Sequence, residues 1–143
     1  MDNTMALLLS DTYKQCHDRM YPNGLTKLVS YWVPRKSMLE NQNEMVFFGL
    51  QAFIKEYLMG YFQKNFFDLS EDEMLTLYTD SMDVQIGRDN YDLDKIVELH
   101  RLRYLPLEIR ALPEGTLVPM GVPCIEITNT VSYTHLRAHE TSA

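Results

Sequence analysis

The fold class is decided by one stretch of sequence, Leu105-Pro-Leu-Glu-Ile-Arg-Ala-Leu-Pro-Glu-Gly115. Within Leu107–Ala111 apolar and charged side chains alternate, which is the period of a strand with one buried face. Leu112–Gly115 then places a proline and a glycine where a type I turn favours them. Before this stretch the apolar residues recur at helical spacing, so the pattern predicts helices on one side of it and strands on the other.

On the carboxy-terminal side, two further strands are predicted at Leu117–Met120 and Cys124–Thr128. On the other side, the strongest helix pattern consists of aromatic and aliphatic residues that recur over four turns: Val46, Phe47, Leu50, Phe53, Ile54, Tyr57, Leu58 and Tyr61. The segment Ser37–Glu44 before this helix is polar and is expected to be a loop.

Two more helices are predicted between this first helix and the strands. Ser70-Glu-Asp-Glu73 is a capping-box pattern, and the helix that it begins should run to about Gln85 and end at Gly87. Asp92 or Asp94 should cap the next helix. In that helix three apolar residues should face the core, namely Ile96, Val97 and Leu102. His100 should be solvated on the exposed side of the helix.

The amino-terminal region combines extended and helical patterns. Met5–Leu9 is expected to be a short buried strand, and Thr12–Met20 a short helix with Asp11 as its N-cap. Thr26–Val33 is expected to be a strand covered on both faces. Since strands and helices do not alternate regularly, the predicted fold class is α+β, with a mixed or antiparallel sheet and helices in a sandwich-like domain.

Length and composition favour an ordinary soluble protein. The chain has 143 residues, 45% hydrophobic and 23% charged, and a formal net charge of −7. This acidity argues against nucleic acid as a partner. The two cysteines match no metal or redox spacing, and no apolar run is long enough for a signal peptide or a membrane span, so a cytoplasmic protein is expected. A local concentration of basic residues could form an anion site or a solvated face: Lys14, Arg19, Lys27, Arg35 and Lys36.

The last residues differ in character from the rest of the chain. The segment 131–143 continues no helical or extended period and resembles the translation of a common sequencing-library adapter. We therefore expect residues 1–130 to be an incomplete amino-terminal α+β domain and residues 131–143 to be a non-native tail. His135, His139 and Glu140 have the spacing of metal ligands on a helix, but they lie in this tail, so no metal site is expected.

One short segment, Asp11–Pro22, combines an acid, aromatic residues, a base and an imidazole. The spacing puts Tyr13 and His17 on one face of a helix. These side chains could form a binding site, or they could be a cap, core tyrosines and a solvated lysine. Spacing alone favours the second interpretation.

Five motifs of this chain resemble, in their order and spacing, the amino-terminal region of nicotinamide phosphoribosyltransferases. They are Leu7-Leu-Leu-Ser-Asp-Thr-Tyr-Lys-Gln-Cys-His17, Tyr21-Pro22, Val29-Ser-Tyr-Trp-Val-Pro-Arg35, Phe47-Phe-Gly-Leu-Gln51 and Leu105–Gly115. The resemblance implies a pentosyltransferase of NAD salvage, which moves phosphoribosyl from phosphoribosyl pyrophosphate to nicotinamide. It also implies a homodimer, with a barrel domain that would follow residue 130, so this piece alone should be inactive.

The resemblance assigns substrate-binding roles to three residues. Tyr13 would stack on the pyridine ring in the partner subunit's active site, and Asp11 would line the same pocket. Arg35 would bind phosphate, also in the partner's site. Mg²⁺ would be bound by the pyrophosphate and water, without protein ligands in this piece. A nicotinate phosphoribosyltransferase and a non-catalytic binding or dimerisation module are the alternatives.

For the other motif residues a structural role is expected. Gly49 should permit close helix packing, and Pro113 and Gly115 should form a turn. His17 could be a core residue or could support the residues that contact substrate.

Overall fold

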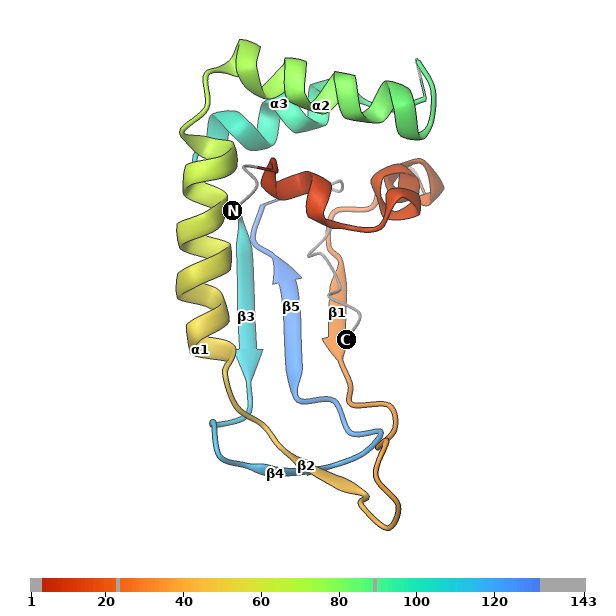
Figure 1. Cartoon of the computed structure of the whole chain (residues 1–143), viewed down its shortest axis with the longest axis vertical. Helices are drawn as coiled ribbons and strands as arrows, with labels where there is room; N and C mark the ends of the chain where they lie inside the picture. Colours follow the sequence, from red (N-terminus) through yellow and green to blue (C-terminus); the bar gives the residue numbers. More distant parts are fainter. Residues whose placement is uncertain (1–3, 23, 89, 132–143) are drawn as a thin grey trace. The chain divides into compact units, whose positions relative to one another are not determined.

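The computed structural model describes residues 4–22, 24–88 and 90–131, without the side chains of Cys16, Asp18 and Arg19. The chain divides into two compact units, one formed by residues 1–25 and 53–105 and the other by residues 26–52 and 106–143. Figure 1 shows the helices of the first unit and the strands of the second. Apart from Val131, the predicted tail, with its two histidines, lies outside the described residues, so the expectation that it is non-native stays a prediction.

The first unit, the helical unit, begins with two short 3₁₀ helices, η1 (Ala6–Leu9) and η2 (Thr12–Met20). The expected strand at Met5–Leu9 is therefore wrong, whereas the helix at Thr12–Met20 is present. The first part of the apolar run is buried at Met5, Ala6 and Leu7, whereas Leu9 is 49% exposed. A short buried run has no period that separates strand from helix, which explains the error.

The predicted long helix begins at α1 (Leu50–Phe53), four residues later than expected, and continues as η3 (Ile54–Tyr61) and η4 (Gln63–Phe67). Its later turns are π-helical: the amide of Asp68 donates to the carbonyl of Gln63, five residues back, at 2.8 Å. Val46 belongs to a strand instead, and Gly49 separates strand from helix with a φ of 97°.

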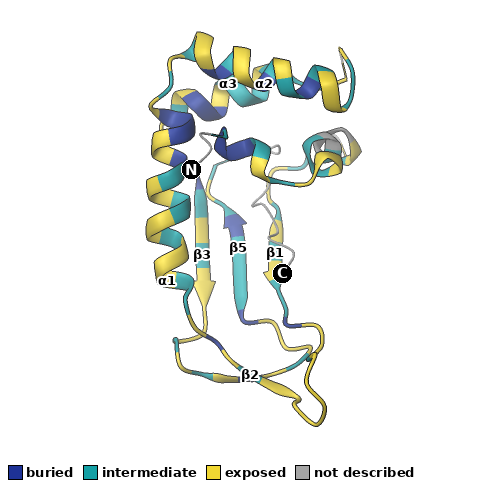
Figure 2. Cartoon of the chain, in the orientation of Figure 1, coloured by how far each residue is buried: buried dark blue, intermediate teal, exposed yellow. Residues whose placement is uncertain are grey.

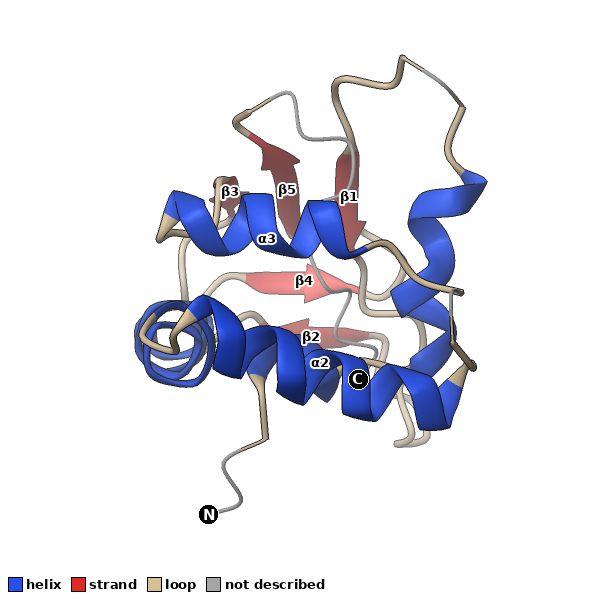
Figure 3. Ribbon diagram, turned by 90° about the horizontal axis from the view of Figure 1, so that it is seen from above, coloured by secondary structure: helices blue, strands red, loops and turns tan. Residues whose placement is uncertain are grey.

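The two remaining helices, α2 (Glu71–Gln85) and α3 (Leu93–Leu102), confirm the predicted caps. Ser70 and Glu73 form both hydrogen bonds of the capping box, and the carboxylate of Asp92 accepts from the amide of Asp94 at 3.0 Å. The buried residues of α3 are Leu99 and His100, whereas the three residues expected to point inward are only half-buried. Figure 3 shows α2 and α3, which contact each other.

His100 is 1% exposed, so the expectation that it is solvated is wrong. Its Nε2 lies 2.9 Å from the carbonyl oxygen of Leu69, and its ring meets that of Phe66 edge-on. A carbonyl only accepts, so this contact is a hydrogen bond in the tautomer that carries the proton on Nε2. The helical unit buries mainly aromatic and sulfur-containing side chains: Met5, Phe62, Phe66, Phe67, Met74, Tyr78, Met82 and Leu99.

The second unit, the sheet unit, contains antiparallel strands only, among the residues described. In its three-stranded sheet β5 (Ile125–Asn129) lies between β1 (Val29–Trp32) and β3 (Leu107–Ala111). A two-stranded sheet pairs β2 (Glu44–Val46) with β4 (Leu117–Pro119). Together with the helices, these sheets confirm the α+β class.

The core of the sheet unit is small. Phe47, Val118 and Cys124 are buried, and four half-buried residues pack against them: Trp32, Met45, Leu50 and Ile125. β1 is shorter than predicted and is not covered on both faces, because Val29 and Tyr31 are 41% and 53% exposed. Figure 2 shows the partial exposure of these strands. An antiparallel sheet can leave one face in water, which the β-branched composition alone does not reveal.

The turn between β3 and β4 confirms the predicted roles of Pro113 and Gly115. The amide of Thr116 donates to the carbonyl of Pro113 at 3.2 Å, and Gly115 has a φ of 91°. The role predicted for Gly49, close helix packing, is wrong. A Cβ added there would meet no atom within 4 Å, so its role is the positive φ rather than close helix packing.

Candidate functional site

The helix η2 is held in the helical unit by two polar side chains on one of its faces. Thr12 donates to the side-chain carbonyl of Gln85 at 2.7 Å, and Gln15 donates to the backbone carbonyl of Leu7 at 2.6 Å. Tyr78 of α2 donates to the Gln15 side chain at 3.5 Å. A 3₁₀ helix has about three residues per turn, so Thr12 and Gln15 lie on the same face. These contacts fix the rotation of η2 about its axis.

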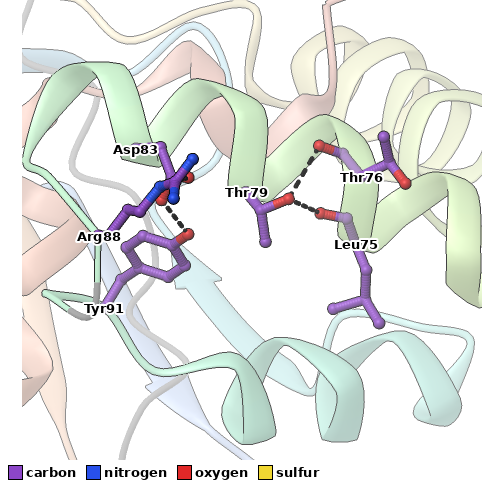
Figure 4. A network of polar contacts seen from close by, with 6 residues as sticks. All are labelled: Leu75, Thr76, Thr79, Asp83, Arg88 and Tyr91. Carbon is purple, nitrogen blue, oxygen red and sulfur yellow. Dashed lines mark hydrogen bonds and ion pairs between the residues drawn. The ribbon is translucent and has the colours of Figure 1, made fainter.

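The end of α2 that receives Thr12 is itself held by polar contacts. The Tyr91 hydroxyl donates to Asp83 at 2.6 Å, and the guanidinium of Arg88 contacts the same carboxylate at 3.2 Å (Figure 4). In addition, Gln85 donates to the hydroxyl of Ser81 at 2.7 Å. The Gln85 side chain, which accepts the hydrogen bond from Thr12, therefore belongs to a helix end that polar contacts hold in place.

Tyr13 lies on a different face of η2 from Thr12 and Gln15, and 59% of its surface is exposed. Its ring contacts the His17 ring, with centroids 5.2 Å apart and planes inclined by 57°. The ammonium of Lys14 lies 5.9 Å from the centroid of the Tyr13 ring. The predicted pairing of Tyr13 with His17 is confirmed as a contact between their rings. An exposed aromatic surface of this kind can stack on a flat ligand.

Asp11 immediately precedes η2 and is exposed. Its backbone carbonyl accepts a hydrogen bond from the amide of Lys14 at 2.9 Å, which closes the first turn of the helix. Asp11 and Tyr13 therefore belong to one short segment, as the sequence indicates. The sequence analysis did not predict that Thr12 and Gln15 hold this segment. Polar residues three apart share a face in a 3₁₀ helix, so their spacing was the available signal.

Arg35 lies in the sheet unit, in the irregular segment that follows β1. The preceding residue, Pro34, is buried, and its carbonyl accepts from the amide of Gly121 at 2.6 Å. The Arg35 side chain is exposed and has no hydrogen bond or ion pair with any residue that the structure describes. The structure thus places Asp11 and Tyr13 together, whereas Arg35 belongs to the other unit.

The other basic residues of the predicted local concentration are divided between the two units. Lys14 is in the helical unit, and Lys27 and Lys36 are exposed residues of the sheet unit. The Arg19 side chain lies outside the description. Among the described residues, no group of three or more histidine, cysteine or acidic side chains has a geometry that could hold a metal ion. Nor is any described helix both long enough and apolar enough to cross a membrane.

Comparison with known proteins identifies the family. Residues 5–109 match the model of the nicotinamide phosphoribosyltransferase amino-terminal domain. A nicotinamide phosphoribosyltransferase of Acinetobacter baylyi is 38% identical over 125 residues, which cover 84% of this chain and 25% of that protein. The α+β fold and these matches define the class, an amino-terminal domain of a phosphoribosyltransferase. The chain belongs to the nicotinamide phosphoribosyltransferase family.

Both comparisons agree with the resemblance of the five motifs, and both name the nicotinamide enzyme. The chain spans about a quarter of the length of the relative that it matches. The roles of Asp11, Tyr13 and Arg35 are not tested by either comparison and stay predictions.

Proposed function

We propose that this chain is the amino-terminal part of an enzyme that transfers phosphoribosyl from phosphoribosyl pyrophosphate to nicotinamide. The products are nicotinamide mononucleotide and pyrophosphate, in the salvage of NAD. The observation that supports this most is the exposed ring of Tyr13. This ring lies on the helix η2, which the hydrogen bond of Thr12 holds in place, and within a segment that matches the family. We further propose that the complete enzyme is a cytoplasmic homodimer.

Asp11 and Tyr13 would form the part of the nicotinamide site that this chain supplies to its partner subunit. Nicotinamide has a flat and neutral ring, which gains from stacking on the exposed phenol of Tyr13. Its carboxamide carries N–H donors that the carboxylate of Asp11 can accept. The family model and the relative, both named for the nicotinamide enzyme, support the amide over the acid as the substrate.

Arg35 would bind the phosphates of phosphoribosyl pyrophosphate in the partner's site. A guanidinium offers several donors in a fixed plane and can contact two phosphate oxygens at once. The exposed side chain has no internal partner among the described residues, so no existing ion pair must be broken before it binds. Mg²⁺ would enter with the pyrophosphate and would neutralise part of its charge. The donor sets of the described residues offer no cage for it.

The proposal is tested first on the gene. Reading the natural gene through codon 130 should show an open frame that continues for several hundred codons and encodes alternating strands and helices. A stop codon at that place would overturn the enzyme and favour a non-catalytic binding or dimerisation module. The purified chain of 143 residues should form no nicotinamide mononucleotide, whereas the full-length protein should form it from nicotinamide and not from nicotinate.

Kinetics of the full-length protein test the roles of the residues. Tyr13→Ala removes a stacking contact worth about 1 kcal/mol, so the KM for nicotinamide should rise about fivefold or more. Arg35→Ala should raise the KM for phosphoribosyl pyrophosphate instead, and Arg35→Lys should restore only part of it, because an ammonium lacks the planar pair of donors. Lys27→Ala, an exposed basic residue outside the proposed site, is the control. An unchanged KM for nicotinamide in Tyr13→Ala would remove Tyr13 from the site.

A further inference from the structure

We propose that His17 is a positioning residue for Tyr13, whose imidazole supports one side of the phenol ring and leaves the rest of the ring surface to the ligand. The inference rests on the proposed function and extends it by one residue. It starts from the contact between the two rings, whose centroids are 5.2 Å apart and whose planes are inclined by 57°.

The contact between these rings is not a simple result of their spacing. In an α-helix, residues four apart are offset by about 40° around the axis and are neighbours. In a 3₁₀ helix, with about three residues per turn, they are offset by about 120°. Tyr13 and His17 lie in the 3₁₀ helix η2 and still meet, so the two side chains must lean toward each other around the helix. The pair is therefore an interaction of its own.

The two members of the pair differ in exposure. His17 is half-buried, whereas Tyr13 is 59% exposed. The helix beneath them is fixed by the hydrogen bonds of Thr12 and Gln15, so η2 presents both rings in a defined direction. A half-buried ring on a fixed helix is suited to limit the rotation of an exposed ring beside it.

Limiting that rotation has a consequence for binding. A side chain that is immobilised only when ligand binds loses rotamer freedom at that moment, which weakens affinity. A tyrosine already restrained by a neighbouring ring loses less. Another described neighbour of the ring, the Lys14 ammonium, lies 5.9 Å from its centroid, farther than the imidazole of His17.

The test compares variants of the full-length protein by steady-state kinetics. His17→Ala should raise the KM for nicotinamide about two- to tenfold, the range that corresponds to one aromatic pair. The KM for phosphoribosyl pyrophosphate and kcat should not change. His17→Phe keeps a ring without its nitrogens and should restore the KM for nicotinamide to within about twofold of the natural value. In the Tyr13→Ala background, His17→Ala should add no further increase.

Other outcomes would overturn the inference, and each has a different meaning. If His17→Ala and His17→Phe both lower kcat, His17 acts on the reaction through its nitrogens and not through its ring. If Tyr13→Ala raises the KM for nicotinamide and His17→Ala does not, only the positioning role is wrong. If Tyr13→Ala itself has no effect, the proposed role of Tyr13 fails, and the inference fails with it.

A second measurement tests the contact without catalysis. In the chain of 143 residues, the proton resonances of the Tyr13 ring should show a nuclear Overhauser effect to the His17 ring. They should also shift in His17→Ala while the resonances of Thr12 and Gln15 stay in place. Absence of the effect from a chain in which those two residues keep their hydrogen bonds would show that the rings do not pair.

Discussion

The two units of the chain differ in how completely they bury their apolar residues. The helical unit encloses a continuous set of aromatic and methionine side chains, and Phe66, Met74 and Met82 have no exposed surface. Among the described residues of the sheet unit, the apolar core cluster has three buried members, Phe47, Val118 and Cys124, while Val46 and Phe48 are 60% and 80% exposed. Among the described residues, the helical unit therefore buries more large apolar side chains than the sheet unit does.

This difference bears on the candidate site. Tyr13 is on a helix that polar contacts fasten to the well-packed unit, so its position is set by contacts within that unit. Arg35 follows an edge strand of the unit with the smaller core and has no partner among the described residues. The ring contact is thus preorganised within the chain, whereas the direction of the guanidinium is left for its ligand to define.

The largest effect should separate the two cores. Phe66→Ala removes a ring that touches Phe62, Phe67 and His100, and it should lower the free energy of unfolding by about 3–5 kcal/mol. Val118→Ala in the sheet unit should cost about 2 kcal/mol, since it removes two methyl-sized groups. Urea unfolding followed by circular dichroism measures both. Equal losses would contradict the ranking of the cores.

Backbone strain gives the next largest effect. Gly49 has a φ of 97°, and a Cβ there would meet no neighbouring atom. Gly49→Ala should therefore destabilise the chain by about 1–2 kcal/mol through strain alone. Gln51→Ala is the control, because Gln51 is an exposed residue of the helix α1. If Gly49→Ala were neutral in thermal unfolding, the positive φ would not be what separates β2 from α1.

Loss of a helix cap is expected to be smaller. Ser70→Ala removes the acceptor for the amide of Glu73 at the start of α2, which should cost about 1 kcal/mol. Ser70→Asp keeps an acceptor and should restore most of the lost free energy of unfolding, less the repulsion between its carboxylate and the acidic first turn. Hydrogen exchange of the first amides of α2 is the measurement. Unchanged protection in Ser70→Ala would show that packing alone sets this helix end.

The smallest effect concerns pH. Arg101 donates to Glu71 at 2.8 Å, and this contact lowers the pKa of Glu71 below its ordinary value of 4.5. The stabilising contribution is therefore present above pH 4.5 and is lost as the pH falls through the lowered pKa. Because the pair is exposed, the effect should be small and screened by salt. Arg101→Met should flatten the acid side of the stability profile, with Arg88→Met as the control; an unchanged acid limb would refute the coupling.

Much of the secondary structure could be predicted, because its signals are local. The capping box at Ser70, the Asp92 cap and the alternation in β3 all appear in the structure. The errors occur where a residue's environment is set by distant parts of the chain. Val46 and Phe47 fit a helical period, but Val46 belongs to β2 and Phe47 follows that strand, where it packs with Val118 and Cys124, which are far away in sequence. His100 looks solvated on its own helix, but the Leu69 carbonyl and the Phe66 ring enclose it.

The sequence alone determined the caps of α2 and α3, which depend on residues close together along the chain, and the α+β class and the family, which depend on patterns in the order of the residues. Only the tertiary structure decided which residues hold η2 and which core is complete. The contacts of Thr12 with Gln85 and of Gln15 with Tyr78 join segments separated by 73 and 63 residues. No period in the sequence records such a contact, because it forms only after packing has brought the helices together.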